Sequence, residues 1–265
     1  MREILEDANA HRDDGYGRAQ HHTKVQLPKR FYKETGIKAV EGGFAVTLDG
    51  RATKTPGQLP VVVPVERLAQ EMAAEWAAQE DLIDPETMPL VRLLNSALEG
   101  GEKAAPALRE EVIKYAGGDL MLYRAGNPRE LVAEQEAEWD KALVVLARHF
   151  EVSFQPTVGI VHQDQPEETR GRLSEAVSDA NLIALTAMVS VVGLTGSGLL
   201  AIGLRHKLFD ADEAWKAAHV DEDHNVRLWG EDTEAVGRRA KRRIEYDAAL
   251  KVLSLVDAHS PDLAQ

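Results

Sequence analysis

Cysteine is absent from this chain, which excludes disulfide bonds, thiolate nucleophiles and thiolate metal sites. A surplus of positive charge is absent too: 31 lysines and arginines stand against 44 aspartates and glutamates, a formal net charge of -13. Binding nucleic acid through its phosphates needs a positive surface, so this balance argues against that class of function. The lack of cysteine also fits a reducing compartment such as the inside of a cell.

Known catalytic signatures are missing as well. The sequence contains no Gly-x-Ser-x-Gly elbow, no His-Glu-x-x-His pair and no dinucleotide-binding fingerprint. The run Gly193–Gly198 is rich in glycine, but it lacks the Gly-Lys-Ser/Thr ending of a phosphate-binding loop and follows a helical pattern instead of a strand. We therefore interpret it as a turn. The motifs predict no catalytic residue, no cofactor and no enzymatic activity.

The sequence also lacks an uninterrupted membrane-spanning segment. Residues 180–204 carry no charged side chain, and the run is long enough to cross a bilayer. However, Asn181, Thr186 and Ser190 interrupt its apolar surface, and the glycines of Gly193–Gly198 would break a helix near the bilayer centre. The pattern therefore favours a buried helical hairpin over a membrane-spanning helix.

The first part of the chain predicts a polar arm followed by a small antiparallel sheet. Residues 1–26 are polar and follow neither a helical nor a strand period, so we interpret them as an arm. Residues 30–63 contain short apolar runs of strand character. The dipeptide Asp49-Gly50 between two of these runs predicts a tight hairpin, because both central positions of a type I′ turn need a positive φ. The following apolar residues recur at helical spacing and place Trp76 in a core stripe.

The remainder of the chain predicts mostly helices. The expected segments are 90–98, 105–115, 128–150, 166–179, 181–194, 199–208, 211–228 and a last helix from about Thr233. In that last helix the apolar residues are spaced by four, which gives the helix one apolar face: Val236, Ala240, Ile244, Ala248, Val252 and Val256. The sequence thus predicts an α+β protein, with a small antiparallel β-containing N-terminal domain at residues 1–125 and a mostly helical C-terminal domain at residues 126–265.

The segment 221–232 is the strongest candidate for a binding surface. It crowds acidic residues around one tryptophan, just ahead of a basic run. Carboxylates beside a large aromatic can pair with a cation and also bury apolar area on a partner. We therefore expect Glu222, Asp221, Asp223 and Trp229 to contact a partner protein. A merely solvated helix face explains the spacing equally well.

A metal-dependent enzyme that uses the acidic cluster Asp221 to His224 is the alternative. Carboxylates and imidazole do bind divalent cations, but consecutive helical residues point about 100 degrees apart, so the four side chains cannot all face one ion. The expectation is therefore that no metal binds here. On the same geometry Glu222 and Asp223 diverge, and one of the two is expected to be only solvated.

The basic run Arg238 to Arg243 offers a third possibility, an RNA or anion partner. The run lies on a helix whose other face is apolar and which also carries acids, among them Glu234, Glu245 and Asp247. Ion pairs on the helix surface explain the basic residues adequately, and we favour that interpretation over nucleic-acid binding.

Several segments carry a family resemblance through their order and spacing between about Leu27 and Ala258. They are Lys29-Arg30-Phe31-Tyr32, Val46-Thr47-Leu48-Asp49-Gly50-Arg51 with Lys54-Thr55-Pro56, Glu75-Trp76 with Gln79, Glu138-Trp139, and Asp221-Glu222-Asp223 leading to Trp229-Gly230. Together they resemble the assembly chaperones of the ATP synthase α subunit, a family of mitochondria and α-proteobacteria.

The resemblance implies a function without catalysis. Members of that family hold the free α subunit of the catalytic sector until a β subunit replaces them, and so prevent aggregation of an exposed subunit interface. The resemblance also implies that Glu222, by its place before Trp-Gly, is the critical glutamate. The chain departs from the family pattern at His224-Asn225, where an aromatic or a longer polar residue is expected.

The N-terminal residues bear on the compartment. Met1 to Asp7 lack the apolar core of a secretory signal, and their acids argue against an arginine-rich transit peptide. Combined with the family resemblance, this predicts a bacterial copy of the chaperone in the cytoplasm.

Overall fold

The structure, a computed structural model, describes residues 27–257. The predicted arm at residues 1–26 lies outside the described residues. Residues 27–31 and Gln79–Asp84 form a small compact unit of their own, and all other described residues form the larger unit. The predicted fold class is confirmed, because a small antiparallel sheet precedes a mostly helical region.

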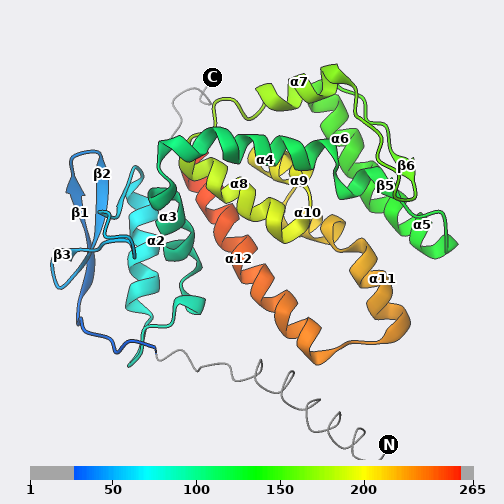
Figure 1. Cartoon of the computed structure of the whole chain (residues 1–265). Helices are drawn as coiled ribbons and strands as arrows, with labels where there is room; N and C mark the ends of the chain where they lie inside the picture. The colour runs from blue at the N-terminus through cyan, green and yellow to red at the C-terminus, as the bar shows by residue number, and fades with distance from the viewer. Residues whose placement is uncertain (1–26, 258–265) are drawn as a thin grey trace, which may run out of the picture. The chain divides into compact units, whose positions relative to one another are not determined.

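Four short strands form the sheet at the start of the larger unit (Figure 1). They are β1 (Thr35–Val40), β2 (Gly43–Leu48), β3 (Arg51–Ala52) and β4 (Val62–Val63), and β2 pairs antiparallel with each of the other three. The β2–β3 connection is the Asp49-Gly50 hairpin that the sequence predicts. Both residues have positive φ, 47° and 74°, as a type I′ turn requires.

Helix α2 (Glu66–Ala77) packs against β1, β2 and β4. Its residues Leu68 and Met72 are fully buried, which confirms the predicted apolar stripe. Trp76 is half-buried at the end of this stripe. Its ring contacts the edge of the Tyr32 ring at a centroid distance of 5.6 Å, and the Tyr32 hydroxyl donates to the Trp76 carbonyl at 2.7 Å. Trp76 therefore joins α2 to the segment that leads into β1.

Helices make up most of the rest. They are α3 (Pro89–Gly100), α4 (Ala105–Gly117), α5 (Arg129–Gln135), α6 (Lys141–Phe150), α7 (Glu167–Glu175), α8 (Leu182–Thr195), α9 (Gly198–Arg205), α10 (Ala211–Ala218), α11 (Val220–Trp229) and α12 (Thr233–Asp257). Short 3₁₀ turns lie at η2 (Pro85–Thr87), η3 (Glu102–Ala104) and η4 (Leu120–Leu122), and β5 (Tyr123–Arg124) pairs in parallel with β6 (Thr157–Val158). The domain boundary near Gly126 stays a prediction.

Helix α8 is the centre of the helical core. It packs against α3, α4, α9 and α12, and Figure 1 shows α4 and α12 running beside it. Its surface is apolar nearly all round, with Leu185, Met188 and Val191 fully buried, and a helix of that kind needs neighbours on every side. No helix in residues 27–257 is long and apolar enough to cross a membrane.

The predicted buried hairpin is confirmed as α8 and α9, joined at Gly196 and Ser197. Gly196 ends α8 with a left-handed φ of 73°, and the Ser197 hydroxyl caps α9 by accepting from Leu200 N–H at 2.9 Å. The fully buried carboxylate of Asp119 accepts from the Ser197 hydroxyl at 2.7 Å and from Leu199 N–H at 2.9 Å. The glycine-rich run is therefore a structural turn, as the sequence predicts.

One helical prediction is wrong in detail, and a second is confirmed with one irregular turn. The segment 211–228 is two helices and not one, because the His219 ring takes the Trp215 carbonyl that the His219 N–H would bind in a continuous helix. The His219 N–H instead reaches the Lys216 carbonyl, which ends α10. The segment 128–150 contains a π-helical turn, η5 (Glu136–Asp140), between α5 and α6.

The apolar face predicted for the last helix is buried along only part of its length. Ala248, Val252 and Val256 are buried in α12, whereas Val236 and Ile244 are about half exposed at 48% and 53%. The core therefore covers the predicted apolar face only in the second half of α12. The helix is longer than the core that covers it.

A candidate partner-binding hairpin

Helices α11 and α12 run antiparallel and are joined by a turn of three residues, Gly230 to Asp232 (Figure 1). We refer to α11, this turn and α12 as the α11–α12 hairpin. Gly230 ends α11 with a φ of 85°, a conformation that glycine adopts without steric cost. The three predicted acidic residues lie in the first turn of α11, where the helix dipole favours negative charge.

The three acids point to different neighbours. Asp221 faces α5, where its carboxylate accepts from the Gln135 side chain at 2.7 Å. Glu222 accepts two hydrogen bonds from one guanidinium nitrogen of Arg242, at 2.8 and 3.0 Å. Asp223 accepts from Arg239. The predicted divergence is confirmed, but the expectation that Glu222 or Asp223 is only solvated is wrong, since an arginine of α12 meets each of them.

The buried His219 lies about one helical turn before Glu222. Burial lowers the pKa of this imidazole, so the ring is neutral near pH 7. Its Nδ1 lies 2.7 Å from the Trp215 carbonyl, which can only accept, so Nδ1 carries the proton. Nε2 is then unprotonated, and its distance of 3.9 Å from the Glu222 carboxylate is not a charge pair. Arg242 is therefore the main counter-charge of Glu222.

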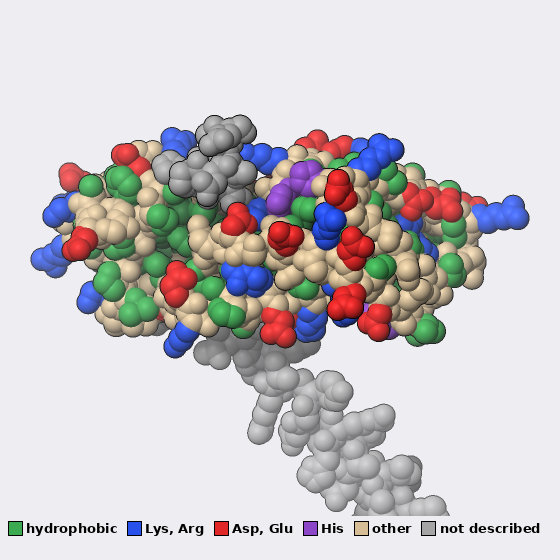
Figure 2. All heavy atoms as spheres, turned by 90° about the horizontal axis from the view of Figure 1, so that it is seen from above, with side chains coloured by type: hydrophobic (Ala, Val, Ile, Leu, Met, Phe, Trp, Pro, Cys, Tyr) green, Lys and Arg blue, Asp and Glu red, His purple; other side chains and the backbone are tan. Residues whose placement is uncertain are grey.

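The basic run is also occupied by ion pairs. Arg238 pairs with Asp232 and Glu234, Lys241 with Glu86, and Arg243 with Asp212 and Asp247. This confirms that ion pairs account for the run, although most of them reach other segments instead of the next turn of the same helix. Because each cation of the run has an acidic partner, the run presents no stripe of uncompensated positive charge to nucleic acid. Acidic and basic side chains are likewise interspersed on the face of the molecule that Figure 2 shows.

A groove of about 370 Å³ lies along the hairpin. Apolar residues of both helices line it, among them Val226 of α11 and Val236 and Ala240 of α12. Glu222 and Arg239 add charged walls, and the Glu222 side chain is 33% exposed. The groove thus combines an apolar lining with a carboxylate that solvent and a partner can reach.

Trp229 lies at the end of α11, where it is 83% exposed, and the neighbouring Leu228 is 59% exposed. Trp229 follows Glu222 by seven residues, which is two helical turns, so the two side chains leave α11 on nearly the same face about 10 Å apart along the axis. The structure therefore brings Glu222 and Trp229 to one side of the hairpin. Asp221 lies on the side toward α5.

Metal binding finds no support at this cluster. Among residues 27–257 no group of three or more histidines and acids is arranged to hold a metal ion. His224 is 5% exposed and its Nδ1 lies 3.4 Å from the Glu134 carboxylate on α5. The acids and histidine of α11 therefore bind neighbouring helices instead of converging on a common point.

Sequence reasoning missed the partners of the acids. It treated the acidic segment and the basic run as separate features, whereas the structure pairs Asp223 with Arg239 and Glu222 with Arg242, which are 16 and 20 residues apart. A signal was present, because both pairs are nested about the turn at Gly230. Two helices folded back at that glycine bring such positions together.

Comparisons with known proteins agree with this fold. Residues 29–147 match the family described as ATP12 chaperone protein. The mitochondrial atp12 protein of Schizosaccharomyces pombe is 22% identical over 245 residues, which cover 87% of this chain and 84% of the relative.

Two solved bacterial structures are more similar in sequence. The Atu1473 protein of Agrobacterium tumefaciens is 38% identical with a TM-score of 0.84, and the match covers 91% of both chains. Atp12 of Paracoccus denitrificans is 34% identical with a TM-score of 0.78 over 86% of this chain and 98% of that one. With this identity over nearly the whole length of both proteins, the chain belongs to the ATP12 chaperone family.

Proposed function

We propose that this chaperone binds the free α subunit of the ATP synthase catalytic sector and shields its interface until the β subunit replaces it. Membership of the ATP12 family supports a chaperone role in ATP synthase assembly. The protein is a chaperone and not an enzyme, so the alternative of a metal-dependent enzyme at Asp221 to His224 is set aside. The α subunit as partner and the bacterial cytoplasm as compartment are parts of our proposal.

The observation that carries the proposal is apolar surface left uncovered on the α11–α12 hairpin. Trp229 and Leu228 are exposed at the end of α11, and Val236 and Ile244 continue the exposed apolar surface along α12. Large apolar side chains grouped on a surface mark interaction sites, and tryptophan is the residue most enriched among binding hot spots. A subunit interface that is exposed before assembly offers the matching apolar surface.

Glu222 is the negatively charged group of the proposed contact with the α subunit. Its carboxylate lines the groove and is partly exposed, so a lysine or arginine of the α subunit can share it with Arg242. Asp221 and Asp223 support this contact from either side, because their bonds to Gln135 and Arg239 fix α11 between α5 and α12. Charge complementarity of this kind favours the correct partner over others.

Release follows from competition and needs no chemical step. The hairpin surface is a modest interface, whereas permanent complexes between subunits bury larger and more apolar areas. A β subunit that covers the same region of the α subunit with a larger interface displaces the chaperone by mass action. Neither a nucleotide nor a metal has to bind the chaperone for this exchange.

The test is a capture experiment with purified subunits. Immobilised chaperone is expected to retain free α subunit and to release it when β subunit is added. Trp229→Ala is expected to weaken capture roughly 30-fold, since truncation of a hot-spot tryptophan costs about 2 kcal/mol or more. Phe31→Ala, which removes another exposed aromatic (73%), is the matched control and should leave capture unchanged. Equal capture by wild type and Trp229→Ala would rule out the hairpin as the binding surface.

A further inference from the structure

A second apolar surface lies in the loop that follows β6. Val158, Ile160 and Val161 are 69%, 94% and 74% exposed, and Gly159 between them has a left-handed φ of 92°. Three aliphatic side chains within four residues contribute almost nothing to the core at these exposures. Grouped exposed aliphatics of this kind mark a surface that another molecule covers.

The loop is braced at both ends. Gly159 N–H donates to the Arg124 carbonyl at 2.9 Å, and β6 pairs with β5. After the aliphatic residues, the His162 ring lies 2.8 Å from the Tyr123 hydroxyl, and the buried Gln165 side chain bonds to both the N–H and the carbonyl of Gln155. The aliphatic residues are therefore held in a set position, which lowers the entropy lost when a partner binds.

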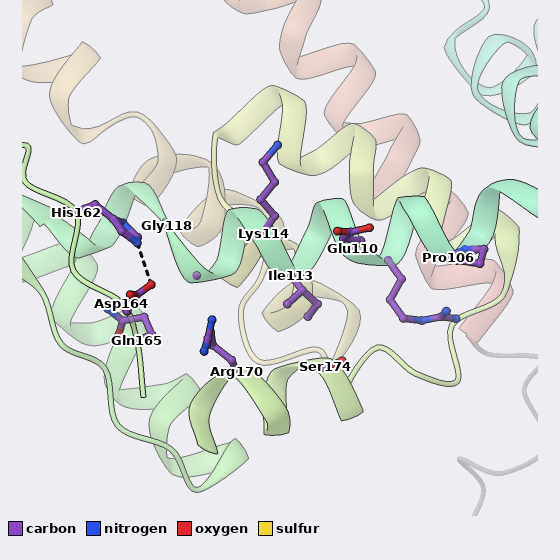
Figure 3. A pocket seen from close by; sticks show the side chains of 12 residues that line it. Pro106, Glu110, Ile113, Lys114, Gly118, His162, Asp164, Gln165, Arg170 and Ser174 are labelled. Carbon is purple, nitrogen blue, oxygen red and sulfur yellow. Dashed lines mark hydrogen bonds and ion pairs between the residues drawn. The ribbon is translucent and has the colours of Figure 1, made fainter. Parts of the chain in front are cut away.

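A groove of about 640 Å³ begins where this loop ends. It lies between α4 and α7, and His162, Asp164 and Gln165 line it at one end (Figure 3). Its lining runs from Pro106 to Gly118 along α4, about 18 Å at 1.5 Å per residue. That length matches five or six residues of extended polypeptide at about 3.3 Å each. Gly117 and Gly118 carry no side chain, so another backbone can approach closely there.

The lining carries more positive than negative charge, in contrast to the chain as a whole. Arg109, Lys114 and Arg170 stand against Glu110 and Asp164. Figure 3 shows Arg170 of α7 and Ile113 of α4 pointing into the space between the two helices.

The bonds of these cations leave positive charge for a ligand. Arg109 donates to the carbonyls of Val177, Ser178 and Ala180 and to no carboxylate in these contacts. The backbone N–H of Arg170 donates to the Pro166 carbonyl at 3.1 Å, whereas its side chain forms no hydrogen bond or ion pair within residues 27–257. Lys114 has an exposed pair with Glu111 at 3.3 Å, which contributes little, and its ammonium lies 5.7 Å from the centre of the Tyr115 ring. A carboxylate entering the groove therefore meets the Arg170 guanidinium, whose charge no acidic side chain of residues 27–257 pairs with.

We propose that this groove, together with the loop at Val158 to Val161, binds an extended polypeptide segment of five or six residues in which aliphatic and acidic side chains alternate. Alternate side chains of an extended segment point in opposite directions. One set packs on Ile160, Val161 and Ile113 while the other places a carboxylate near Arg170. This site is separate from the α11–α12 hairpin and does not depend on which subunit the hairpin binds.

The test uses the full chain and a fluorescein-labelled hexapeptide of alternating isoleucine and aspartate, with binding followed by fluorescence anisotropy. We expect saturable binding that weakens at least tenfold in Arg170→Glu and in the double variant Ile160→Ser with Val161→Ser. Both sites are exposed, so circular dichroism should confirm that these variants are folded. Arg238→Glu on α12 is the matched charge reversal and should bind the peptide as wild type does.

The outcomes separate this site from the proposed function. Replacing the aspartates of the peptide by lysine should abolish binding, and replacing the isoleucines by serine should weaken it strongly. Failure of the peptide to bind, equal binding of the lysine peptide, or unchanged binding by Arg170→Glu would each overturn the proposal. The Trp229→Ala variant should bind the hexapeptide normally while losing α subunit, so either proposal can fail while the other stands.

Discussion

The molecule contains two antiparallel helix pairs that resemble each other in their turns but differ in what holds them. Both α8–α9 and α11–α12 turn back after a glycine with left-handed φ, Gly196 and Gly230. The α8–α9 pair is buried, with Leu199 and Leu200 fully inaccessible. The α11–α12 pair is joined by ion pairs and leaves Trp229 exposed.

This difference shows that one helix pair stabilises the fold while the other has surface available for a partner. Burial of apolar surface provides most of the free energy of folding, so α8–α9 has little freedom to vary its surface. Surface ion pairs contribute about 0–1 kcal/mol each, so α11–α12 is positioned by interactions that are individually weak. The second pair can therefore present apolar residues to a partner without depending on them for its own folding.

The largest expected effect lies at Gly198, the first residue of α9 in the buried pair. A Cβ added at Gly198 would lie 2.4 Å from both Ala116 N and the Val112 carbonyl oxygen, which belong to the backbone of α4. Because α4 cannot move aside locally, Gly198→Ala is expected to destabilise the protein by about 3 kcal/mol or more. Chemical denaturation measures this.

The matched control is Gly193→Ala. Gly193 is exposed on α8, and a Cβ added there meets no atom within 4 Å. It should be neutral or stabilise by up to about 1 kcal/mol, because alanine favours helix. Similar losses in the two variants would contradict the close packing of α9 on α4.

Asp119→Asn should have the next largest effect. The buried carboxylate accepts from Ser197 Oγ, Leu199 N–H and Met121 N–H, and an amide cannot accept all three in the same way. A loss of about 2 kcal/mol is expected from the unsatisfied groups. Urea denaturation monitored by circular dichroism gives this value.

The effect of Asp119→Asn should also depend on pH. Burial raises the pKa of Asp119 to about 7 from its usual 3.8. Between these values the folded protein keeps a proton that the unfolded chain has lost, so the wild type loses stability as pH rises through this window. The variant lacks this titration, and its deficit should shrink as pH rises from 4 to 7. A deficit that is constant with pH would show that the carboxyl is ionised throughout.

The exposed pair should respond more weakly. A double-mutant cycle of Asp223→Ala and Arg239→Ala is expected to give a coupling free energy of about 0.5–1 kcal/mol, because both side chains are about a third exposed or less. The coupling should fall when salt is raised from 0.05 to about 1 M, since exposed charges are screened. A coupling above about 2 kcal/mol would mean that ion pairs fix this hairpin as firmly as burial fixes α8–α9.

The smallest effect on stability is expected at Trp229. Trp229→Ser should change the free energy of unfolding by less than about 0.5 kcal/mol, because the side chain is 83% exposed. Trp139→Ser is the contrasting change, since that indole is 2% exposed and its N–H donates to the Ala217 carbonyl at 2.7 Å. Thermal melts of the two variants should differ widely. A large loss in Trp229→Ser would assign the residue to the fold.

Local patterns allowed much of the fold to be predicted. Asp49-Gly50 specifies its turn through backbone sterics alone, and the uncharged run around Gly196 specifies a buried hairpin through composition. The split at His219 could not be predicted, because it depends on one ring taking the Trp215 carbonyl. The exposed stripe at Val236 and Ile244 was likewise beyond prediction, since helical spacing identifies an apolar face but not how far the core extends to cover it.

The residues of the candidate site stay a prediction from the sequence, and their arrangement could not be predicted. Trp229 and the acids were identified from composition, and the structure places Glu222 and Trp229 on one side of α11. Their counter-charges at Arg239 and Arg242 depend on the direction in which two helices pack, which no local pattern encodes. The groove at Arg170 was missed entirely, because it combines α4, α7 and a loop that are remote in sequence.

The length of helix α12 bears on the proposed binding of a partner. Its 25 residues make a rod of about 37 Å, and its buried residues all lie from Tyr246 onward. The first half of the rod therefore extends the hydrophobic face beyond the core while the second half anchors it. A binding surface that is already shaped before encounter loses little entropy through ordering on association, so under the proposed function most of the conformational adjustment falls to the incoming subunit.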